Sequence, residues 1–248
     1  MYQVSVVSYL NTAPFVYGLK HNNPLSSGWN YSLDIPAVCA QKLLDGICDV
    51  GLVPVAILPK LGEYHLIGDT CIGADGAVDS VVLLHEVPLE EINSVALDYQ
   101  SRTSVNLCRL LMRDYWKKEI EYIDTQSDVH EFAKGTTAAV LIGDRVFEHA
   151  SKFTYVTDLS KAWKDWTGLP FVFAAWVSRK KMPSAFTESF NQQVSLGLKH
   201  MDEVIAEARA KYPAAFPVEN YLRNKISYTL NKRALQGMET FLTMLGTL

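Results

Sequence analysis

The sequence predicts an α/β protein of two lobes with a central cleft, and two observations support this prediction. Short apolar segments typical of strands alternate with segments of helical periodicity. The alternation is interrupted near residues 85–92 and 175–183, which indicates two crossings between lobes. The first lobe would be discontinuous, over residues 1–87 and 179–248, and the second would span residues 88–178. Ligands of such folds bind beyond the strand ends, so the cleft is the expected site.

The first part of the chain alternates short strands with short helices. A helix is expected over residues 14–19, and a second begins at Pro36, where the missing N–H costs nothing. Apolar residues recur at helical spacing after Pro36, and Gly46 lies near the end of that helix. The expected strands cover residues 4–7, 32–35, 49–53, 64–68 and 80–84.

The second part continues the alternation from Pro88. Helices are expected over residues 103–116, over residues 129–134 and from Asp144 onward, and the first of them has one apolar face. The expected strands cover residues 94–97, 121–123, 138–142 and 171–177. The last of these strands leads out of the second lobe.

The C-terminal part is expected to be helical. One helix keeps the 3.6-residue period until Tyr212, because the residue before Pro213 disfavours helical backbone. A final amphipathic helix follows it. The apolar positions are Phe186, Phe190, Val194, Leu198, Met201 and Ile205 in the first helix, and Leu235, Met238, Leu242 and Leu245 in the second.

The composition argues against several classes of protein. Apolar residues make up 48% of the chain, which is enough for a core, and the net charge is −4. No basic run is present, which argues against binding to nucleic acid or to a membrane surface. The four cysteines form no CxxC motif or zinc spacing, so we interpret them as buried apolar residues and expect no metal. The chain enters a strand pattern at once, without a signal peptide, so we expect a cytoplasmic protein.

The segment 163–176 contains three tryptophans and a Thr-Gly-Leu-Pro turn before an apolar run. The run is typical of a strand buried on both faces. The aromatic-rich turn before the run suits the mouth of a ligand site. Alternatively, the tryptophans are core residues at a junction between lobes.

A polar segment after the first strand is the first candidate for ligand binding. Ser8 and Tyr9 supply hydroxyl groups, and Asn11 can both donate and accept hydrogen bonds. They precede a helix start, where backbone N–H groups attract anions. The simpler alternative is an N-cap and turn, which this segment alone favours.

A second polar segment follows the first strand of the second lobe. Ser101, Thr103 and Ser104 surround a predicted helix start, and Arg102 lies among them. A cation at that end is unfavourable for the helix dipole, so an anionic ligand would explain it. An ion pair between Arg102 and Asp98 or a neighbouring acid explains it equally well.

Two further segments carry candidate residues. Gly143 and Asp144 end a strand, where they could contact a ligand, although a helix cap is the better explanation for Asp144. Ser80 follows a glycine-containing loop that could approach a ligand. No GxGxxG or P-loop motif is present, so no nucleotide cofactor is expected.

Five segments occur together, in this order, in one family, and the chain resembles the chorismate dehydratases of the futalosine route to menaquinone. The resemblance runs from about residue 4 to about residue 180, and the helical tail matches only in character. It implies a fold similar to type II periplasmic binding proteins, used by a cytoplasmic enzyme. The segments are residues 8–14, 49–54, 101–105, 141–144 and 166–174.

The resemblance also implies an activity. The family dehydrates chorismate to 3-[(1-carboxyvinyl)oxy]benzoate without a metal or organic cofactor, and its catalytic Asn and Ser fall on Asn11 and Ser80. The binding residues would be Ser8, Tyr9, Ser101, Arg102, Thr103, Ser104, Gly143 and Asp144. No His or Glu in the five segments suits a general base, so we expect the substrate's own enolpyruvyl carboxylate to accept the proton.

Three other functions remain as alternatives, of which the weakest is a ligand-responsive regulatory domain, since no DNA-binding module accompanies it. A solute-binding protein for small anions would share the two lobes and their closure. The related enzyme that makes a dihydroxynaphthoate later in the same route would share the fold. Its N-terminal motif differs from the Tyr9-Leu10-Asn11 found here. The oligomeric state is not predicted.

Overall fold

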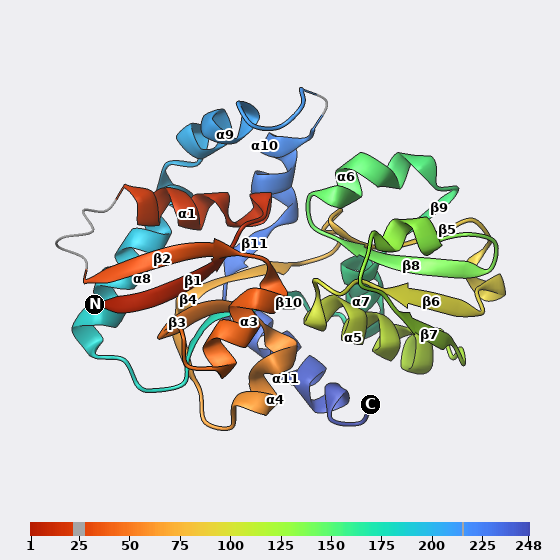
Figure 1. Cartoon of the computed structure of the whole chain (residues 1–248), viewed down its shortest axis with the longest axis horizontal. Coiled ribbons are helices and arrows are strands. Elements are labelled where there is room, and N and C mark those ends of the chain that lie inside the picture. Colours follow the sequence, from red (N-terminus) through yellow and green to blue (C-terminus); the bar gives the residue numbers. More distant parts are fainter. Residues whose placement is uncertain (22–27, 215) are drawn as a thin grey trace.

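The computed structural model describes residues 1–21, 28–214 and 216–248. Figure 1 shows two lobes side by side, each built around a β-sheet with helices packed against it. Both sheets mix parallel and antiparallel pairs, which confirms the predicted α/β class and the two lobes. Among the described residues, no helix combines the length and apolar character that a membrane span requires.

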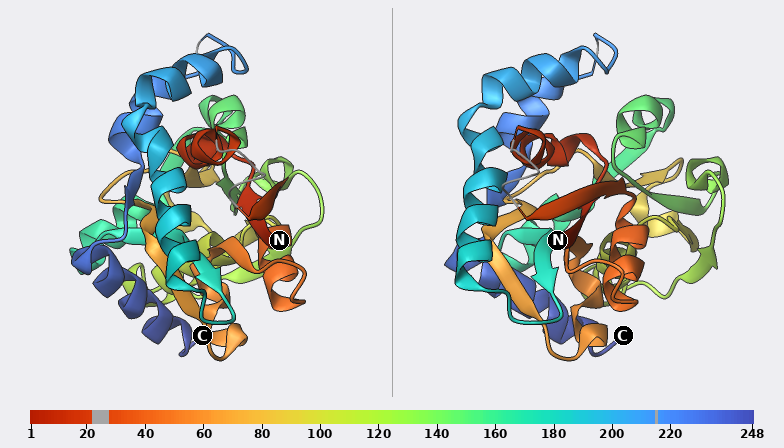
Figure 2. Two further views of the ribbon diagram at one scale, coloured as in Figure 1. Left: turned by 90° about the vertical axis from the view of Figure 1, so that its left-hand side faces the viewer. Right: turned by 60° about the vertical axis from the view of Figure 1, so that its left-hand side comes forward.

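The first lobe surrounds a six-stranded sheet, in which β1 is parallel to β2 and β3 while β10 is antiparallel to β3 and β4. Its strands, in spatial order, are β11 (Ser227–Thr229), β4 (His65–Ala74), β10 (Phe171–Ser178), β3 (Val50–Pro54), β1 (Tyr2–Val7) and β2 (Trp29–Asp34). Its helices are α1 (Ala13–Lys20), α3 (Pro36–Leu44), α4 (Leu58–Leu61), α8 (Ser184–Lys199), α9 (Met201–Arg209), α10 (Val218–Asn220) and α11 (Lys232–Leu245). Helix α8 packs against α1 and β4, as Figure 2 shows.

The second lobe surrounds a five-stranded sheet, in which β6 is parallel to β7 and β8 while β5 is antiparallel to β8 and β9. Its strands, in spatial order, are β7 (Glu121–Asp124), β6 (Ser94–Leu97), β8 (Thr137–Ile142), β5 (Val81–His85) and β9 (Tyr155–Asp158). Its helices are α5 (Arg102–Leu110), α6 (Arg145–His149) and α7 (Leu159–Thr167). Helix α5 continues into a π-helical turn, η4 (Leu111–Tyr115), so the predicted helix 103–116 is confirmed.

Two strands lie in the other sheet from the one predicted. Strand β5 was expected in the first lobe, within residues 1–87, but it pairs with β8 and β9. Strand β10 was expected in the second lobe, within residues 88–178, but it pairs with β3 and β4. Both strands are buried on both faces, so their apolar pattern does not reveal which sheet they join. The chain therefore crosses between the sheets within residues 75–80 and 168–170.

Four described elements were not predicted from the sequence: α4, β9, α7 and β11. Helix α7 contains Trp163, which is fully buried and packs edge-on against Phe171 and Phe241. Its indole nitrogen donates to the carbonyl oxygen of Pro170 at 3.3 Å. Trp163 and Trp176 are thus core residues, as the alternative held.

The four cysteines are buried and free, as predicted. Burial raises the pKa of Cys39, Cys71 and Cys108 to about 12 and that of Cys48 to about 11. These thiols stay protonated near neutral pH and behave as small apolar residues.

Candidate functional site

A cavity lies where the two lobes meet, at the ends of β1, β3 and β8 and the start of α5. It has a volume of about 50 Å³, which is room for a few water molecules. The predicted site residues that line it are Tyr9, Asn11, Ser80, Ser101, Thr103, Ser104 and Gly143. The structure therefore brings together segments that lie far apart in the sequence.

Three predicted site residues do not line this cavity. Ser8 is exposed in a neighbouring groove beside α1. Asp144 turns its carboxylate to the backbone N–H of Leu10, at 3.1 Å, and to the hydroxyl of Tyr212. Arg102 lines a separate, larger cleft on the other side of Ser101, and Ser101 borders both spaces.

Asn11 is held by a tight turn after β1. The short 3-10 helix η1 (Leu10–Thr12) begins there, and the hydroxyl of Thr12 donates to the carbonyl of Tyr9 at 2.8 Å. The N–H of Leu10 is capped by the Asp144 carboxylate from the second lobe. The Oδ1 atom of Asn11 is buried and has no hydrogen-bond partner among the described residues. A buried amide oxygen without a partner is costly, so it is available for a ligand that can donate a hydrogen bond.

Ser80 is held by an unusual backbone conformation. Asp79 before it has a φ of 63°, in the left-handed region that L residues rarely adopt. The Asp158 carboxylate supports this turn by accepting from the N–H groups of Val78 and Asp79, at 2.9 and 2.7 Å. The hydroxyl of Tyr221 donates to Ser80 Oγ at 2.6 Å. Ser80 is therefore fixed in place, with 1% of its surface exposed.

The start of α5 supplies the remaining hydroxyl groups. Ser101 is its N-cap, and its Oγ accepts from the N–H of Ser104 at 3.0 Å, an arrangement that serine favours at a helix start. Thr103 Oγ1 donates to the carbonyl of Phe173 and accepts from the N–H of Ala56. Those two partners belong to the first lobe, so Thr103 ties the lobes together. The Ser104 hydroxyl has no partner among the described residues.

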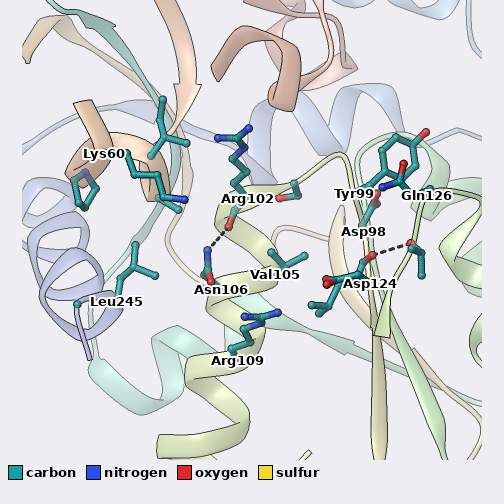
Figure 3. A pocket seen from close by; sticks show the side chains of 17 residues that line it. Lys60, Asp98, Tyr99, Arg102, Val105, Asn106, Arg109, Asp124, Gln126 and Leu245 are labelled. Carbon is teal, nitrogen blue, oxygen red and sulfur yellow. Dashed lines mark hydrogen bonds between the residues drawn. The ribbon is translucent and has the colours of Figure 1, made fainter. Parts of the chain in front are cut away.

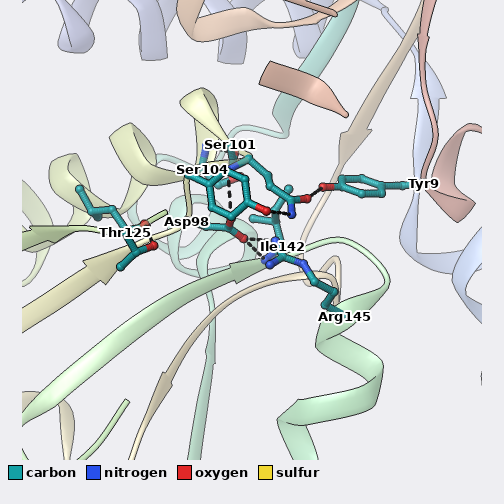
Figure 4. Close-up of polar contacts among 10 residues, drawn as sticks. Tyr9, Asp98, Ser101, Ser104, Thr125, Ile142 and Arg145 are labelled. Carbon is teal, nitrogen blue, oxygen red and sulfur yellow. Dashed lines mark hydrogen bonds and ion pairs between the residues drawn. The ribbon is translucent and has the colours of Figure 1, made fainter. Parts of the chain in front are cut away.

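Asp98 is the anion nearest the start of α5, and Figure 4 shows its contacts. It forms an ion pair with Arg145 and accepts from the N–H of Gln100 at 3.0 Å. Burial raises the pKa of Asp98 more than the Arg145 guanidinium lowers it. Among the described residues Arg102 forms no ion pair, so the alternative of a pair with Asp98 or a neighbouring acid is wrong.

Arg102 instead faces the larger cleft, which Figure 3 shows. Lys60 lies on one wall of this cleft, and Arg102 and Arg109 project from α5. Among the described residues, none of these three cations forms an ion pair. Arg102 has one long hydrogen bond, from Nη2 to Gln41 Oε1 at 3.3 Å. Asp98, which pairs with Arg145, and Asp124 also line the cleft, so the three cations outnumber the carboxylates and favour an anionic group there.

A second contact between the lobes closes the cavity. The hydroxyl of Tyr9, from the first lobe, donates to Gln100 Oε1 in the second at 2.5 Å, as Figure 4 shows. Burial is the main cause of the raised pKa of Tyr9, so its hydroxyl stays neutral. With Thr103 and Asp144, this contact holds the lobes in a closed arrangement.

The chemistry available in the cavity follows from its lining. The described lining residues include hydroxyl and amide groups and an apolar wall, but no Asp, Glu, His, Lys or Arg. Such a lining can orient a polar ligand and donate hydrogen bonds to it. No described side chain of this lining is an ordinary proton acceptor.

Sequence analysis missed Tyr212, Tyr221 and Asp158, which support the site from outside the cavity. Tyr212 and Tyr221 belong to the C-terminal part, whose helical periodicity carries no signal of such contacts. Asp158 is the N-cap of α7, and its carboxylate also accepts from the backbone N–H of Lys161. The local sequence pattern would therefore identify Asp158 only as a helix cap.

The chain resembles known proteins over nearly its full length. Residues 2–247 match the model of the menaquinone biosynthesis family. Chorismate dehydratase of Thermus thermophilus is 29% identical and covers 99% of this chain and 95% of its own. A crystal structure of an Archaeoglobus fulgidus protein superposes with a TM-score of 0.77 at 14% identity, covering 99% and 97% of the two chains. A Candida albicans protein described as having the generic periplasmic binding protein fold superposes with a TM-score of 0.67 at 9% identity, covering 100% and 90%. The fold is thus that of periplasmic binding proteins, and the chain belongs to the menaquinone biosynthesis family.

Proposed function

We propose that the protein is a chorismate dehydratase, a hydro-lyase that converts chorismate to 3-[(1-carboxyvinyl)oxy]benzoate and water. The family and the Thermus thermophilus relative support this function. The observation that carries the proposal is the cavity between the lobes. It brings Asn11 and Ser80 together with the hydroxyl groups of α5, and no side chain of its described lining is an ordinary acid or base.

The reaction suits a cavity without a base. The ring carbon that bears the ether oxygen loses its proton, and the electron pair is delocalised through the ring double bonds to the ring carboxylate. The neighbouring carbon then expels its hydroxyl group, the ring becomes aromatic, and the proton and hydroxide together make one water. The substrate's enolpyruvyl carboxylate is the proton acceptor in this proposal, because the lining provides none.

Asn11 and Ser80 have separate roles in this scheme. The free Oδ1 of Asn11 accepts a hydrogen bond from the substrate hydroxyl group and holds its carbon–oxygen bond in place. The Ser80 hydroxyl donates to the departing oxygen, where negative charge develops. Both groups are fixed before the reaction, so they need little reorganisation during it.

The cavity alone does not provide binding partners for both carboxylates of chorismate. Ser101 and Ser104 can donate hydroxyl hydrogen bonds to one of them. The other would extend past Ser101 toward the cleft, where Arg102 has no ion pair among the described residues. The present cavity is too small for a ring of this size, so the lobes must separate for substrate to enter. The cytoplasmic location stays a prediction.

Incubation of the purified protein with chorismate tests the proposal. We expect the diene absorbance to decay in proportion to protein concentration, and mass spectrometry to detect a product lighter than chorismate by one water. A solute-binding protein would leave the absorbance constant while calorimetry registers binding. If the absorbance stays constant and calorimetry detects no binding, chorismate is not the ligand and the proposal is overturned.

A further inference from the structure

The C-terminal segment reaches the candidate catalytic serine from outside the cavity. Residues Tyr221–Lys225 form the π-helical turn η7, which follows α10. Tyr221 is fully buried and does not line the cavity. We propose that Tyr221 is a positioning residue that turns the proton of the Ser80 hydroxyl toward the substrate. This inference rests on the proposed function.

A serine hydroxyl can donate one hydrogen bond through its proton and accept two through its lone pairs. Tyr221 Oη lies 2.6 Å from Ser80 Oγ and donates to it. One lone pair of Ser80 Oγ therefore accepts the proton of Tyr221, and the proton of the Ser80 hydroxyl must point elsewhere. No other described residue hydrogen-bonds Ser80 Oγ, and the cavity is the open space that Ser80 borders. The proton is thus left for a group in the cavity.

Tyr221 also contacts the other candidate catalytic residue. The Asn11 side chain lies against the same phenol, and both Ser80 and Asn11 act to lower the pKa of Tyr221. Burial acts in the opposite direction and more strongly, so the pKa of Tyr221 is raised overall. Tyr221 therefore stays protonated and remains a donor to Ser80 across the neutral pH range.

A second contact anchors the same turn. Lys225, at the end of η7, forms an ion pair with Asp79 at 2.9 Å. Asp79 is the residue with left-handed backbone that directly precedes Ser80. The turn η7 therefore contacts the Ser80 side chain through Tyr221 and the side chain of the preceding residue, Asp79, through Lys225. π-Helical turns within helices are frequent at functional sites, which agrees with this arrangement.

The variant Tyr221→Phe tests the proposal, because it removes only the hydroxyl group. Tyr228→Phe is the matched control: Tyr228 is also buried, and its hydroxyl has no hydrogen-bond partner among the described residues. We expect Tyr221→Phe to lower kcat by about tenfold to a hundredfold with little change in KM, since one oriented donor in the transition state is affected. Tyr228→Phe should keep kcat within about twofold of the original, because its hydroxyl makes no bond to lose.

The double variant Tyr221→Phe/Ser80→Ala separates positioning from a general loss of structure. If Tyr221 acts through Ser80, the double variant has nearly the kcat of Ser80→Ala alone. Additive losses in kcat, or a Tyr221→Phe kcat within about twofold of the original while Ser80→Ala is impaired, would overturn the positioning role. If the original protein does not turn over chorismate, or if Ser80→Ala is fully active, the proposed function fails instead.

Discussion

Gly143 and Tyr9 are in contact across the two lobes. A Cβ atom placed on Gly143 would lie 3.0 Å from Cε2 of the Tyr9 ring, and the backbone of Gly143 has a φ of +72°. Both the lack of a side chain and the left-handed backbone are therefore required for the closed cavity.

Gly143→Ala is expected to weaken lobe closure and lower kcat/KM by about tenfold or more, since the new methyl group strains the backbone and displaces Tyr9. Gly135→Ala is the matched control, because Gly135 also has a left-handed φ, of +56°, but its Cβ position is empty. Steady-state kinetics and thermal unfolding of both variants check this. Equal loss of kcat/KM in the two variants would show that backbone strain alone, and not contact with Tyr9, is responsible.

Tyr9→Phe removes a hydrogen bond that joins the lobes. The hydroxyls of Tyr9 and Tyr99 both contact Gln100, at 2.5 and 3.0 Å, but only Tyr9 belongs to the first lobe. We expect Tyr9→Phe to lower kcat/KM by about twofold to tenfold, the value of one hydrogen bond. Tyr99→Phe should leave kcat/KM almost unchanged, and a larger effect from Tyr99→Phe would refute a role for the contact in closure.

Arg102→Gln tests whether the larger cleft receives a substrate carboxylate. The loss of a charged hydrogen bond should raise KM for chorismate by about tenfold or more, with a smaller change in kcat. Arg109→Gln is the control, because Arg109 lines the same cleft two helical turns farther along α5, about 10 Å away. Titration of KM against salt adds a second readout, since the Arg102 contribution should weaken as salt rises. An unchanged KM in Arg102→Gln would place both carboxylates elsewhere.

The carboxylate of Asp34 makes the free energy of unfolding depend on pH. Burial raises the pKa of Asp34, but hydrogen bonds from Lys42, Ser32 and Ser5 lower it more, so the pKa lies below its usual value. A lowered pKa stabilises the fold above the unfolded-state pKa, near 4, and this stabilisation is lost as pH falls through the lower folded-state value.

Asp34→Asn should therefore reduce the free energy of unfolding by about 1–3 kcal/mol at pH 7, and the difference from the original protein should shrink toward pH 3. Asp75→Asn is the control, because its ion pair with Lys164 is more exposed and should contribute below about 1 kcal/mol. Urea unfolding at several pH values measures both. If the loss of unfolding free energy in Asp34→Asn stays constant with pH, the lowered pKa of Asp34 is not its cause.

Much of the fold was predictable because its signals are local. The periodicity of α8 and α5, and the apolar runs of β8 and β10, identify these elements without any tertiary information. The sheet that each strand joins was not predictable for β5 and β10. Strands buried on both faces have no polar side to show which lobe they enter.

The candidate site was likewise predictable from the sequence only in part. Asn11 and the α5 hydroxyls follow strand ends, where the chain turns into a helix, and the structure brings them to one cavity. Arg102 lies next to Ser101 in sequence, yet it faces a different cleft, because neighbouring residues on a helix point in different directions. Tyr221 lies 141 positions from Ser80, and nothing in the local pattern marks a contact at that separation.

The most direct test of the central claim is the rate of diene loss from chorismate with the original protein, Asn11→Ala and Ser80→Ala at equal concentrations. We expect rapid loss and a product lighter by one water with the original protein, and rates lower by about a hundredfold or more in each variant. Circular dichroism should confirm that both variants are folded. Folded variants that turn over chorismate at nearly the original rate would contradict the account.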